Sequence, residues 1–339
     1  MGFFTNSIGI DLGTANTLVY VKGKGLVLRQ PSVVAIEEKS RKVMAVGTEA
    51  KDMIGKTPGS IIAYRPLKDG VIAEFDITAK MLKAFFKKAA GSIVFNRPRV
   101  VICVPFGVTE VEKRAVEDAT LEAGAKSVAL IEEPIAAAIG AGLKVNDPRG
   151  CMIVDIGGGT TEVAVISIGG IVNSHSLRVA GDELDEAIIE YVRKKYNVLI
   201  GEFTAEQAKK TIGAVHSDAP SDVMEVRGRN LYSGLPSTIM LTTADVREAM
   251  YEPMRDIINT IKRTLERTPP ELAADIYDQG IMCAGGGAML SGLSTLIHEE
   301  TGIRTIIAKR PLDCVIEGIG IVLDNLESLS GVLSYMKSK

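Results

Sequence analysis

Two aspartates, Asp11 and Asp155, each follow an apolar stretch and precede a turn rich in glycine and threonine. The two segments read S-I-G-I-D-L-G-T-A-N-T-L-V-Y-V from residue 7 and C-M-I-V-D-I-G-G-G-T-T-E-V-A-V-I from residue 151. In each, a second β-branched stretch returns after the turn, which is typical of a β-hairpin. The aspartates lie 144 positions apart, near half the chain length. This repeat predicts two homologous domains that face each other, not a solenoid, whose period would be about 20 to 50 residues.

Glycine turns of this kind can bind phosphate groups, because consecutive backbone N–H groups point away from the chain. Two such turns would hold a triphosphate from both sides. Asp11 and Asp155 would then hold Mg²⁺ through its waters, since this ion takes few protein carboxylates. One such turn is more often an ordinary hairpin, but two copies and a third glycine turn at Gly285 favour a nucleotide site. The sequence has no G-x-x-x-x-G-K-[ST] segment, which excludes a Walker-type NTPase.

Glu133 lies in the segment L-I-E-E-P-I-A-A-A-I-G-A-G, residues 130–142. Pro134 suits the first position of a helix, which places Glu133 at the end of the preceding strand. One interpretation is that Glu133 orients or activates the water that attacks a γ-phosphate. The other is that Glu132 and Glu133 only favour the positive end of the helix. Without the surrounding motifs we would prefer the second.

Glu206 and Lys209 lie three residues apart on a predicted helix, so they share one face. They either form a surface ion pair of little energetic value or meet the ribose and base edge of a nucleotide. His175, His216 and His298 are scattered without the spacing of metal ligands, which favours structural or surface roles.

Alternating strand and helix patterns predict an α/β fold. Asp76 could cap a helix whose apolar stripe contains Ile77, Met81, Phe85 and Ala89. The other expected elements are a strand at 100–104, a helix between a capping box at Thr109 and Glu112 and a stop at Gly124, a helix from Asp182 to Lys195, a helix from Thr204, a strand at 281–284, a helix from about Ala288 and a terminal helix at 314–326.

We expect two lobes, each with an inserted small subdomain. The predicted divisions are 1–30, 66–145 and 314–339 for the core of lobe I (IA), 31–65 for its small subdomain (IB), 146–180 and 251–313 for the core of lobe II (IIA), and 181–250 for its small subdomain (IIB).

Composition limits the classes of function. The net charge of −3 gives no general attraction to polyanions, so nucleic-acid binding is not expected. The four cysteines lack C-x-x-C spacing and lie in or beside apolar runs, which suits reduced, buried thiols in a cytosol. No uncharged apolar run of 18 residues and no signal peptide occur, so we expect a soluble cytoplasmic protein.

The order of these motifs resembles that of the actin, heat-shock chaperone ATPase and sugar-kinase superfamily, and most closely that of the MreB family of bacterial actins. The likeness spans nearly the whole chain. The segments that carry it are I-G-I-D-L-G-T-A-N-T, K-D-G-V-I-A, I-E-E-P-I-A-A-A-I-G-A-G, V-D-I-G-G-G-T-T-E-V-A-V-I-S, R-G-R-N-L-Y-S-G-L-P, T-P-P-E-L-A-A-D-I and D-C-V-I-E-G-I-G. The resemblance implies an actin-like ATPase fold with the nucleotide in the cleft between the two lobes.

The resemblance also implies roles for individual residues. Those expected at the phosphates are Gly13, Thr14, Ala15, Asn16, Gly157, Gly158, Gly159 and Thr160. Those expected at the ribose and base are Gly181, Glu206 and Lys209, and at the adenosine side Gly285, Gly286, Gly287, Ala288 and Met289. Glu133 and Thr160 match the residues that position the attacking water, with Asp155 as a third catalytic candidate. Phe106 replaces a small polar residue and Ala284 replaces threonine, departures that bear on affinity and hydrolysis rate.

By the same resemblance, the chain is expected to be a membrane-associated, ATP-dependent filament protein that organises cell-wall synthesis and maintains cell shape. Slow hydrolysis would accompany polymerisation, with ATP and Mg²⁺ as cofactors and GTP left open. Expected partners are further copies of the chain, the inner membrane surface, RodZ and cell-wall elongation proteins, which places it in the cytoplasm at the inner face of the membrane. The alternative is a small-molecule kinase, although no carboxylate beyond Glu133 suits an acceptor hydroxyl. A chaperone ATPase would need a peptide-binding domain after the core, which we do not find.

A membrane contact is expected at the loop of residues 91–96, where Ile93, Val94 and Phe95 are consecutive bulky apolar residues. Basic residues flank them, and each gains about 1 kcal/mol near anionic lipid. The alternative is that the three side chains pack onto the core, and composition alone does not decide between the two. In the MreB family a loop at this place inserts into lipid, which favours the membrane contact.

Overall fold

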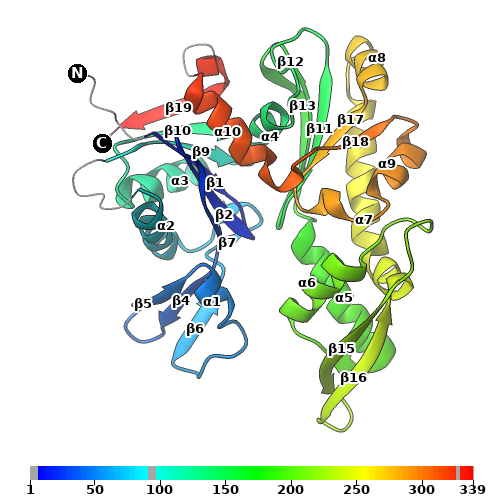
Figure 1. The fold of residues 1–339 in the computed structure, drawn as a ribbon. Helices are drawn as coiled ribbons and strands as arrows, with labels where there is room; N and C mark the ends of the chain where they lie inside the picture. Colours follow the sequence, from blue (N-terminus) through cyan, green and yellow to red (C-terminus); the bar gives the residue numbers. More distant parts are fainter. Residues whose placement is uncertain (1–6, 91–96, 326–328, 339) are drawn as a thin grey trace.

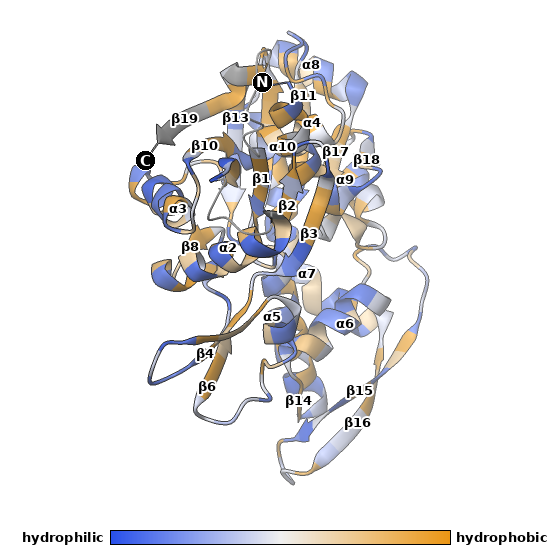
Figure 2. Ribbon diagram, turned by 60° about the vertical axis from the view of Figure 1, so that its left-hand side comes forward, coloured by the Kyte–Doolittle hydropathy of each residue, from blue (hydrophilic) through white to orange (hydrophobic). Residues whose placement is uncertain are grey.

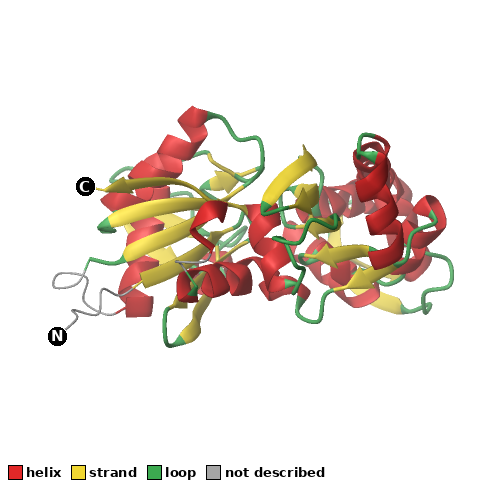
Figure 3. Ribbon diagram, turned by 90° about the horizontal axis from the view of Figure 1, so that it is seen from above, coloured by secondary structure: helices red, strands yellow, loops and turns green. Residues whose placement is uncertain are grey.

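The computed structural model describes residues 7–90, 97–325 and 329–338. Two halves lie side by side, each built on a large sheet flanked by helices (Figure 1; Figure 3). We call the half that contains the N-terminal strands lobe I and the other half lobe II. Smaller sheets extend from the same end of both lobes (Figure 1). The predicted α/β class is confirmed.

Lobe I is built on a six-stranded sheet in the order β19-β10-β9-β1-β2-β3. Strands β1, β2 and β3 form an antiparallel meander, β9 and β10 add in parallel to β1, and β19 pairs antiparallel with β10. Central parallel strands are apolar along their length because both faces are covered. The bounds are β1 Ser7–Leu12, β2 Asn16–Val21, β3 Gly25–Pro31, β9 Arg99–Val104, β10 Ser127–Glu132 and β19 Leu333–Ser338.

Lobe II repeats this plan in a five-stranded sheet of order β13-β12-β11-β17-β18. Strands β11, β12 and β13 form the antiparallel meander, and β17 and β18 add in parallel. The bounds are β11 Cys151–Ile156, β12 Thr161–Ser167, β13 Gly170–Leu177, β17 Ile281–Ala284 and β18 Thr305–Ile307.

The first hairpins of the two lobes have the same register. Asp11 pairs with Leu18 in lobe I, and Asp155 pairs with Glu162 in lobe II. Asp155 lies 144 positions after Asp11, and Glu162 lies the same 144 positions after Leu18. The predicted duplication is therefore confirmed, and the two aspartates occupy equivalent positions near the ends of β1 and β11.

Helices cover the large sheets, and short strands build the smaller ones. The helices are α1 Thr48–Lys51, α2 Phe75–Ala90, α3 Glu110–Glu122, α4 Glu133–Gly140, α5 Gly181–Tyr196, α6 Glu202–Ile212, α7 Thr243–Glu266, α8 Pro270–Gln279, α9 Leu293–Thr301 and α10 Cys314–Asp324, with 3-10 turns at Gly287–Met289, Pro311–Asp313 and Ser330–Val332. The remaining strands are β4 Val34–Glu37, β5 Val43–Val46, β6 Ile61–Tyr64, β7 Leu67–Lys68, β8 Val71–Ile72, β14 Val198–Leu199, β15 Val223–Asn230 and β16 Pro236–Thr242. We retain the four predicted subdomains as a proposal; α7 runs through the proposed boundary at residue 250.

The predicted helix starts and caps were confirmed in some places and wrong in others. The capping box of Thr109 and Glu112 is present at the start of α3, because each side chain bonds the backbone N–H of the other. Asp76 was expected as a cap, but it lies inside the first turn of α2, as Asp182 does in α5. The helix expected from Thr204 begins two residues earlier, at Glu202. The glycine triplet leads into a 3-10 turn rather than an α-helix.

The interior is apolar, as Figure 2 shows for the strands of the large sheets. The stripe of α2 is buried at Ile77, Met81 and Phe85. All four cysteines are free and buried, as expected. Within the described ranges, no helix is long and apolar enough to cross a membrane.

Two helices cross between the lobes with their backbones in contact. A methyl group added at Gly140 of α4 would lie 1.8 Å from the Cys314 carbonyl oxygen, and one at Gly318 of α10 would lie 1.9 Å from the Ala136 carbonyl oxygen. Only glycine allows so close an approach. Since α4 follows β10 of lobe I and α10 follows the last strand of lobe II, this crossing fixes one lobe against the other (Figure 1).

The crossing predicts a stability change. Gly318→Ala should destabilise the protein by about 3 kcal/mol, because the helices must separate to admit the methyl group. Thermal unfolding should show a fall in Tm of several degrees. Gly59→Ala is the control, since a methyl group there meets nothing within 4 Å. Equal Tm values for the two variants would contradict the close crossing.

Candidate functional site

The two glycine turns lie against each other across the lobes. A methyl group added at Gly158 would lie 2.6 Å from Ala15 Cβ, and one at Gly159 would lie 2.8 Å from Thr14 Oγ1. Any larger residue at these glycines would force the turns apart. The sequence-predicted phosphate turns of β1–β2 and β11–β12 are therefore brought together.

Each glycine turn is stabilised by a hydrogen bond within its own lobe. The Ser32 hydroxyl donates to the Gly13 carbonyl oxygen at 2.6 Å in lobe I. In lobe II the Gly157 N–H donates to the Thr160 carbonyl oxygen at 2.9 Å. Thr160 is buried, whereas Asn16 at the far side of the first turn is exposed.

The third glycine turn lies directly against Asp155. Gly285 has a φ of 79°, and a methyl group there would lie 2.3 Å from Asp155 Oδ1. One at Gly287 would lie 2.2 Å from Ile156 Cγ2. Ala288 is buried and Met289 is 61% exposed, so only part of this expected adenosine segment is open to a ligand.

The start of α5 is attached to the second phosphate turn. The Gly181 N–H donates to the Gly157 carbonyl oxygen at 3.2 Å, and the Asp182 N–H donates to the Gly158 carbonyl oxygen at 2.8 Å. Lys209 donates to the Gly181 carbonyl oxygen at 2.5 Å. This places Gly181 and Lys209 beside the phosphate turn.

Glu206 and Lys209 do not pair with each other, so the interpretation of these two side chains as a surface ion pair is wrong. Lys209 pairs with Asp185 at 2.9 Å. Glu206 pairs with Lys210 at 2.5 Å and with Lys51 of α1 at 2.7 Å. Because Lys51 lies within residues 31–65 and Glu206 within residues 181–250, this ion pair joins the two segments that we propose as small subdomains.

Further ion pairs join the two sides. Arg65 pairs with Asp182 at 2.9 Å, and Arg178 lies 3.9 Å from Asp69. All these groups lie partly exposed, where an ion pair contributes about 0 to 1 kcal/mol. Together with the Lys51 pair they join the two sides only weakly.

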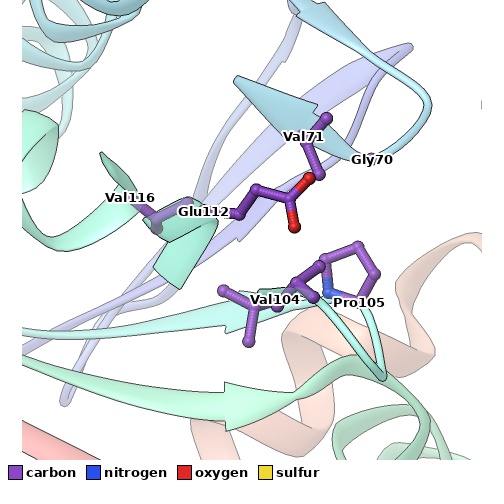
Figure 4. A pocket seen from close by; sticks show the side chains of 7 residues that line it. Gly70, Val71, Val104, Pro105, Glu112 and Val116 are labelled. Atoms are coloured by element: carbon purple, nitrogen blue, oxygen red, sulfur yellow. The ribbon is translucent and has the colours of Figure 1, made fainter. Parts of the chain in front are cut away.

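One turn at the site was not predicted from the sequence. The Asp69–Gly70 turn between β7 and β8 has positive φ at both residues, and the Gly70 N–H donates to Thr14 Oγ1 at 3.0 Å. A methyl group at Gly70 would lie 2.8 Å from Pro105 Cγ and 3.0 Å from Thr160 Cγ2. Figure 4 shows Gly70 and Val71 facing Val104 and Pro105. The D-G dipeptide signals this turn, but its distant partners have no sequence signal.

Carboxyl groups at the base of the cleft have raised pKa values. Burial, and after it the charges of Asp11 and Glu162, raise the pKa of Asp155 to about 7. Burial also raises the pKa of Asp11 to about 6, against the Cys103 thiol, which donates to Asp11 Oδ1 at 3.4 Å. The pKa of Glu133 lies well above its usual range because of burial and then of Asp155, Asp11 and Glu162. These four carboxyl groups therefore lie close enough to repel one another.

Glu162 is the second group that sequence reasoning missed. It is 1% exposed, and burial raises its pKa to about 7. Its position in the T-T-E-V run reads as an ordinary strand residue, so nothing in the sequence separates it from its neighbours.

The residues present fit a hydrated divalent cation. Asp155 Oδ2 is buried and has no hydrogen-bond partner among the described residues. The described part of the chain holds no group of three or more His, Cys, Asp or Glu side chains arranged for a metal. Mg²⁺ uses one or two carboxylates together with water and phosphate oxygens, which is the set that Asp11 and Asp155 could complete.

The carboxyl cluster predicts how stability depends on pH in the absence of nucleotide. Groups whose folded pKa is raised bind protons in the folded state, so their contribution is complete below the unfolded pKa and is lost as pH rises through the folded value. With folded pKa values of about 6 for Asp11 and about 7 for Asp155 and Glu162, stability should fall from pH 5 to pH 7.5. We expect a loss of several kcal/mol, since each unit of difference between folded and unfolded pKa contributes about 1.4 kcal/mol.

Thermal unfolding across this pH range checks the prediction. Asp155→Asn removes one member of the cluster and should flatten the dependence. A variant with the same pH dependence as the wild type would show that the cluster does not cause it.

Comparison with known proteins gives a consistent result. The MreB/Mbl protein family model matches residues 5–331. Cell shape-determining protein Mbl of Bacillus subtilis is 51% identical over 326 residues, which are 96% of this chain and 98% of Mbl. Cell shape-determining protein MreB of Escherichia coli K12 is 51% identical over 337 residues, 98% of this chain and 97% of that protein.

Solved structures share the fold. MreB5 of Spiroplasma citri bound to AMPPNP has a TM-score of 0.92 and 39% identity, covering 96% of this chain and 98% of MreB5. The same protein bound to ADP has a TM-score of 0.91. MamK in a double helical filament, 24% identical with a TM-score of 0.81 over 94% of this chain and 98% of MamK, shows the actin-like fold alone. With the family match over nearly its whole length and about half of its residues identical to these relatives, the chain belongs to the MreB/Mbl family of bacterial actins.

Proposed function

We propose that this protein binds and hydrolyses Mg-ATP between its lobes and uses the cycle to assemble filaments that determine cell shape. The observation that carries the proposal is the contact of two glycine turns beside the half-buried Asp11 and the buried Asp155. The AMPPNP and ADP complexes of MreB5, 39% identical, support an adenine nucleotide. The cell-shape names of Mbl and MreB support the cellular role.

In this proposal, the N–H groups of both turns bind the phosphates, with Gly181, Glu206 and Lys209 at the ribose side and Gly285 to Met289 at the adenosine side. Asp11 and Asp155 hold Mg²⁺ through its waters. Bound Mg²⁺ would neutralise phosphate charge and stabilise the charge that develops as the γ-phosphate leaves. Glu133 and Thr160 orient the attacking water.

Glu133 suits this role for a physical reason. Glu133 is the first residue of α4, directly after β10, and burial and then the charge of Asp155 from the other lobe raise its pKa. The cation proposed beside Asp11 and Asp155 would favour the ionised form of Glu133, and that carboxylate could accept a hydrogen bond from the attacking water. Thr160 lies in the second glycine turn and is buried.

Binding and turnover should separate in variants. Asp155→Asn should weaken Mg-ATP binding in calorimetry by about tenfold or more, since it removes charge at the cation. Glu133→Gln should bind Mg-ATP normally while phosphate release slows at least about a hundredfold, because general-base contributions are of that size.

The control is Glu49→Gln on α1, an exposed carboxyl group outside the cleft, which should leave both quantities unchanged. Parallel titrations with GTP decide the base preference. Normal Mg-ATP binding in both Asp155→Asn and Asp11→Asn would contradict the proposed site. Normal turnover in Glu133→Gln would show that Glu133 acts only as a charge at the helix end.

Self-assembly rests on family membership rather than on a subunit contact in this chain. A small-molecule kinase is not favoured, because the relatives that share about half of the residues are named for cell shape. Membrane attachment through Ile93, Val94 and Phe95 remains a proposal, since residues 91–96 lie outside the described residues. RodZ and cell-wall elongation proteins at the inner membrane face remain proposed partners.

Sedimentation tests the assembly. Wild-type protein with Mg-ATP should pellet as filaments above a threshold concentration, and anionic vesicles should increase the pelleted fraction. Asp155→Asn should stay in the supernatant, since assembly follows nucleotide binding. Protein that stays monomeric under all these conditions while phosphorylating a metabolite would establish the kinase instead.

A further inference from the structure

An ion pair between α1 and α6 joins the two lobes at a second place, apart from the glycine turns (Figure 1). Lys51 is the last residue of α1 in lobe I, and its Nζ donates to Glu206 Oε2 on α6 of lobe II at 2.7 Å. The other oxygen of Glu206, Oε1, accepts a hydrogen bond from Lys210 at 2.5 Å. Each oxygen of this carboxylate therefore has its own lysine, which fixes both the position and the plane of the group.

The helix that carries Lys51 is attached to the first glycine turn through β3. The Thr48 N–H at the start of α1 donates to Gln30 Oε1 at 3.0 Å, and Gln30 lies on β3. Ser32, directly after β3, donates its N–H to the Ala15 carbonyl oxygen in the first glycine turn at 3.0 Å. Lys51 is thus held in lobe I by the same segment that supports this turn.

Glu206 is connected in a similar way to the second glycine turn. Lys209, one helical turn further along α6, donates to the Gly181 carbonyl oxygen at 2.5 Å, and the Gly181 N–H donates to the Gly157 carbonyl oxygen at 3.2 Å. Because the two glycine turns also contact each other, these contacts close a ring. The ring crosses between the lobes at the glycine turns and at the Lys51 pair, and our proposed ribose position lies between these two crossings.

The Glu206 carboxylate can accept further hydrogen bonds. Burial acts to raise its pKa, but the hydrogen bonds from Lys210 and Lys51 outweigh burial and lower the pKa to about 2. Glu206 is therefore ionised at neutral pH. An ionised carboxyl group has about four lone-pair sites, and the two lysines use only part of them. The 2′- and 3′-hydroxyl groups of a ribose are donors that suit the remaining sites.

We propose that Lys51 is a positioning residue for the nucleotide, which holds the Glu206 carboxylate where it accepts a hydrogen bond from a ribose hydroxyl. This inference rests on the proposed function, because it takes Glu206 as a ribose ligand. Lys51 acts through Glu206 and does not itself contact the nucleotide. Since Lys51 comes from lobe I and Glu206 from lobe II, recognition of the ribose depends on both lobes.

Lys51→Gln tests the proposal, because it removes the charge that holds Glu206. Calorimetry with Mg-ADP and with Mg-2′,3′-dideoxy-ADP measures the contribution of the ribose hydroxyls as a ratio of Kd values. In the wild type we expect ADP to bind about tenfold more tightly than the dideoxy nucleotide, the usual size of a hydrogen bond to a charged group. In Lys51→Gln this ratio should fall to about twofold, because two groups that act together are not additive. The loss should appear in the Kd for ADP alone.

Two further variants serve as controls. Lys51→Arg keeps a charged donor and should keep the wild-type ratio of Kd values. Lys42→Gln removes an exposed lysine from the same segment, residues 31–65, and should leave both Kd values unchanged. The Tm of Lys51→Gln without nucleotide should change by only a few degrees, since a partly exposed ion pair adds little stability.

Two results overturn the proposal directly. One is a folded Lys51→Gln protein with the wild-type ratio of Kd values. The other is an equal weakening of ADP and dideoxy-ADP binding in Lys51→Gln, since that is the result of an ion pair that only holds the lobes together.

The proposed function and this inference fail in distinguishable ways. Wild-type protein that binds ADP and dideoxy-ADP equally contradicts the ribose contact of Glu206 and with it the role of Lys51, but leaves the phosphate and magnesium site intact. Wild-type protein that does not bind Mg-ADP contradicts both.

Discussion

Repulsion between carboxyl groups at the base of the cleft is the constraint on which the rest of this structure depends. Asp11 and Glu133 come from one lobe, and Asp155 and Glu162 come from the other. Burial raises the pKa of all four groups, and neighbouring carboxyl groups raise those of Glu133 and Asp155 further. The Cys103 thiol and then Arg29 lower the pKa of Asp11, and the Ser176 hydroxyl lowers that of Glu162. Without a cation, ionisation of this cluster would be unfavourable. The weak ion pairs at the rim can hold the closed form, but a bound cation would hold it far better. Binding and closure would then be one process.

The duplication explains how such a cluster arises and why it is asymmetric. Two hairpins of the same register place their aspartates at equivalent positions, and the glycine crossing of α4 and α10 fixes one lobe against the other. The neighbours then differ. In lobe I the row of directly opposed residues that starts at Asp11 ends in Arg29, which lowers the pKa of Asp11, whereas the row that starts at Asp155 contains Glu162 and Ser176. The charge of Asp11 in lobe I is therefore partly compensated by Arg29, whereas no basic group compensates the charge of Asp155 in the corresponding row of lobe II.

Sequence patterns predicted the parts of this structure that depend on local chemistry. The repeated hairpins, the capping box of α3 and the strand at 281–284 follow from residue type and spacing over a few positions. The features that could not be predicted from the sequence depend on contacts between segments that are distant along the chain. The Asp69–Gly70 turn reads as an ordinary hairpin until the fold places it on Thr14, and Glu206 reads as a surface charge until Lys51 meets it. Glu162 becomes unusual only when burial and its lobe I counterpart Leu18 are both known.

The central claim is that one hydrated divalent cation binds between Asp11 and Asp155 with the nucleotide across both turns. A crystal structure with AMPPNP and Mn²⁺ in place of Mg²⁺ tests it most directly, because Mn²⁺ is located by its anomalous scattering. The account predicts one anomalous peak between the two aspartates, with the phosphates bound by the N–H groups of both glycine turns. A nucleotide bound to one lobe only, or a peak remote from both aspartates, would contradict it.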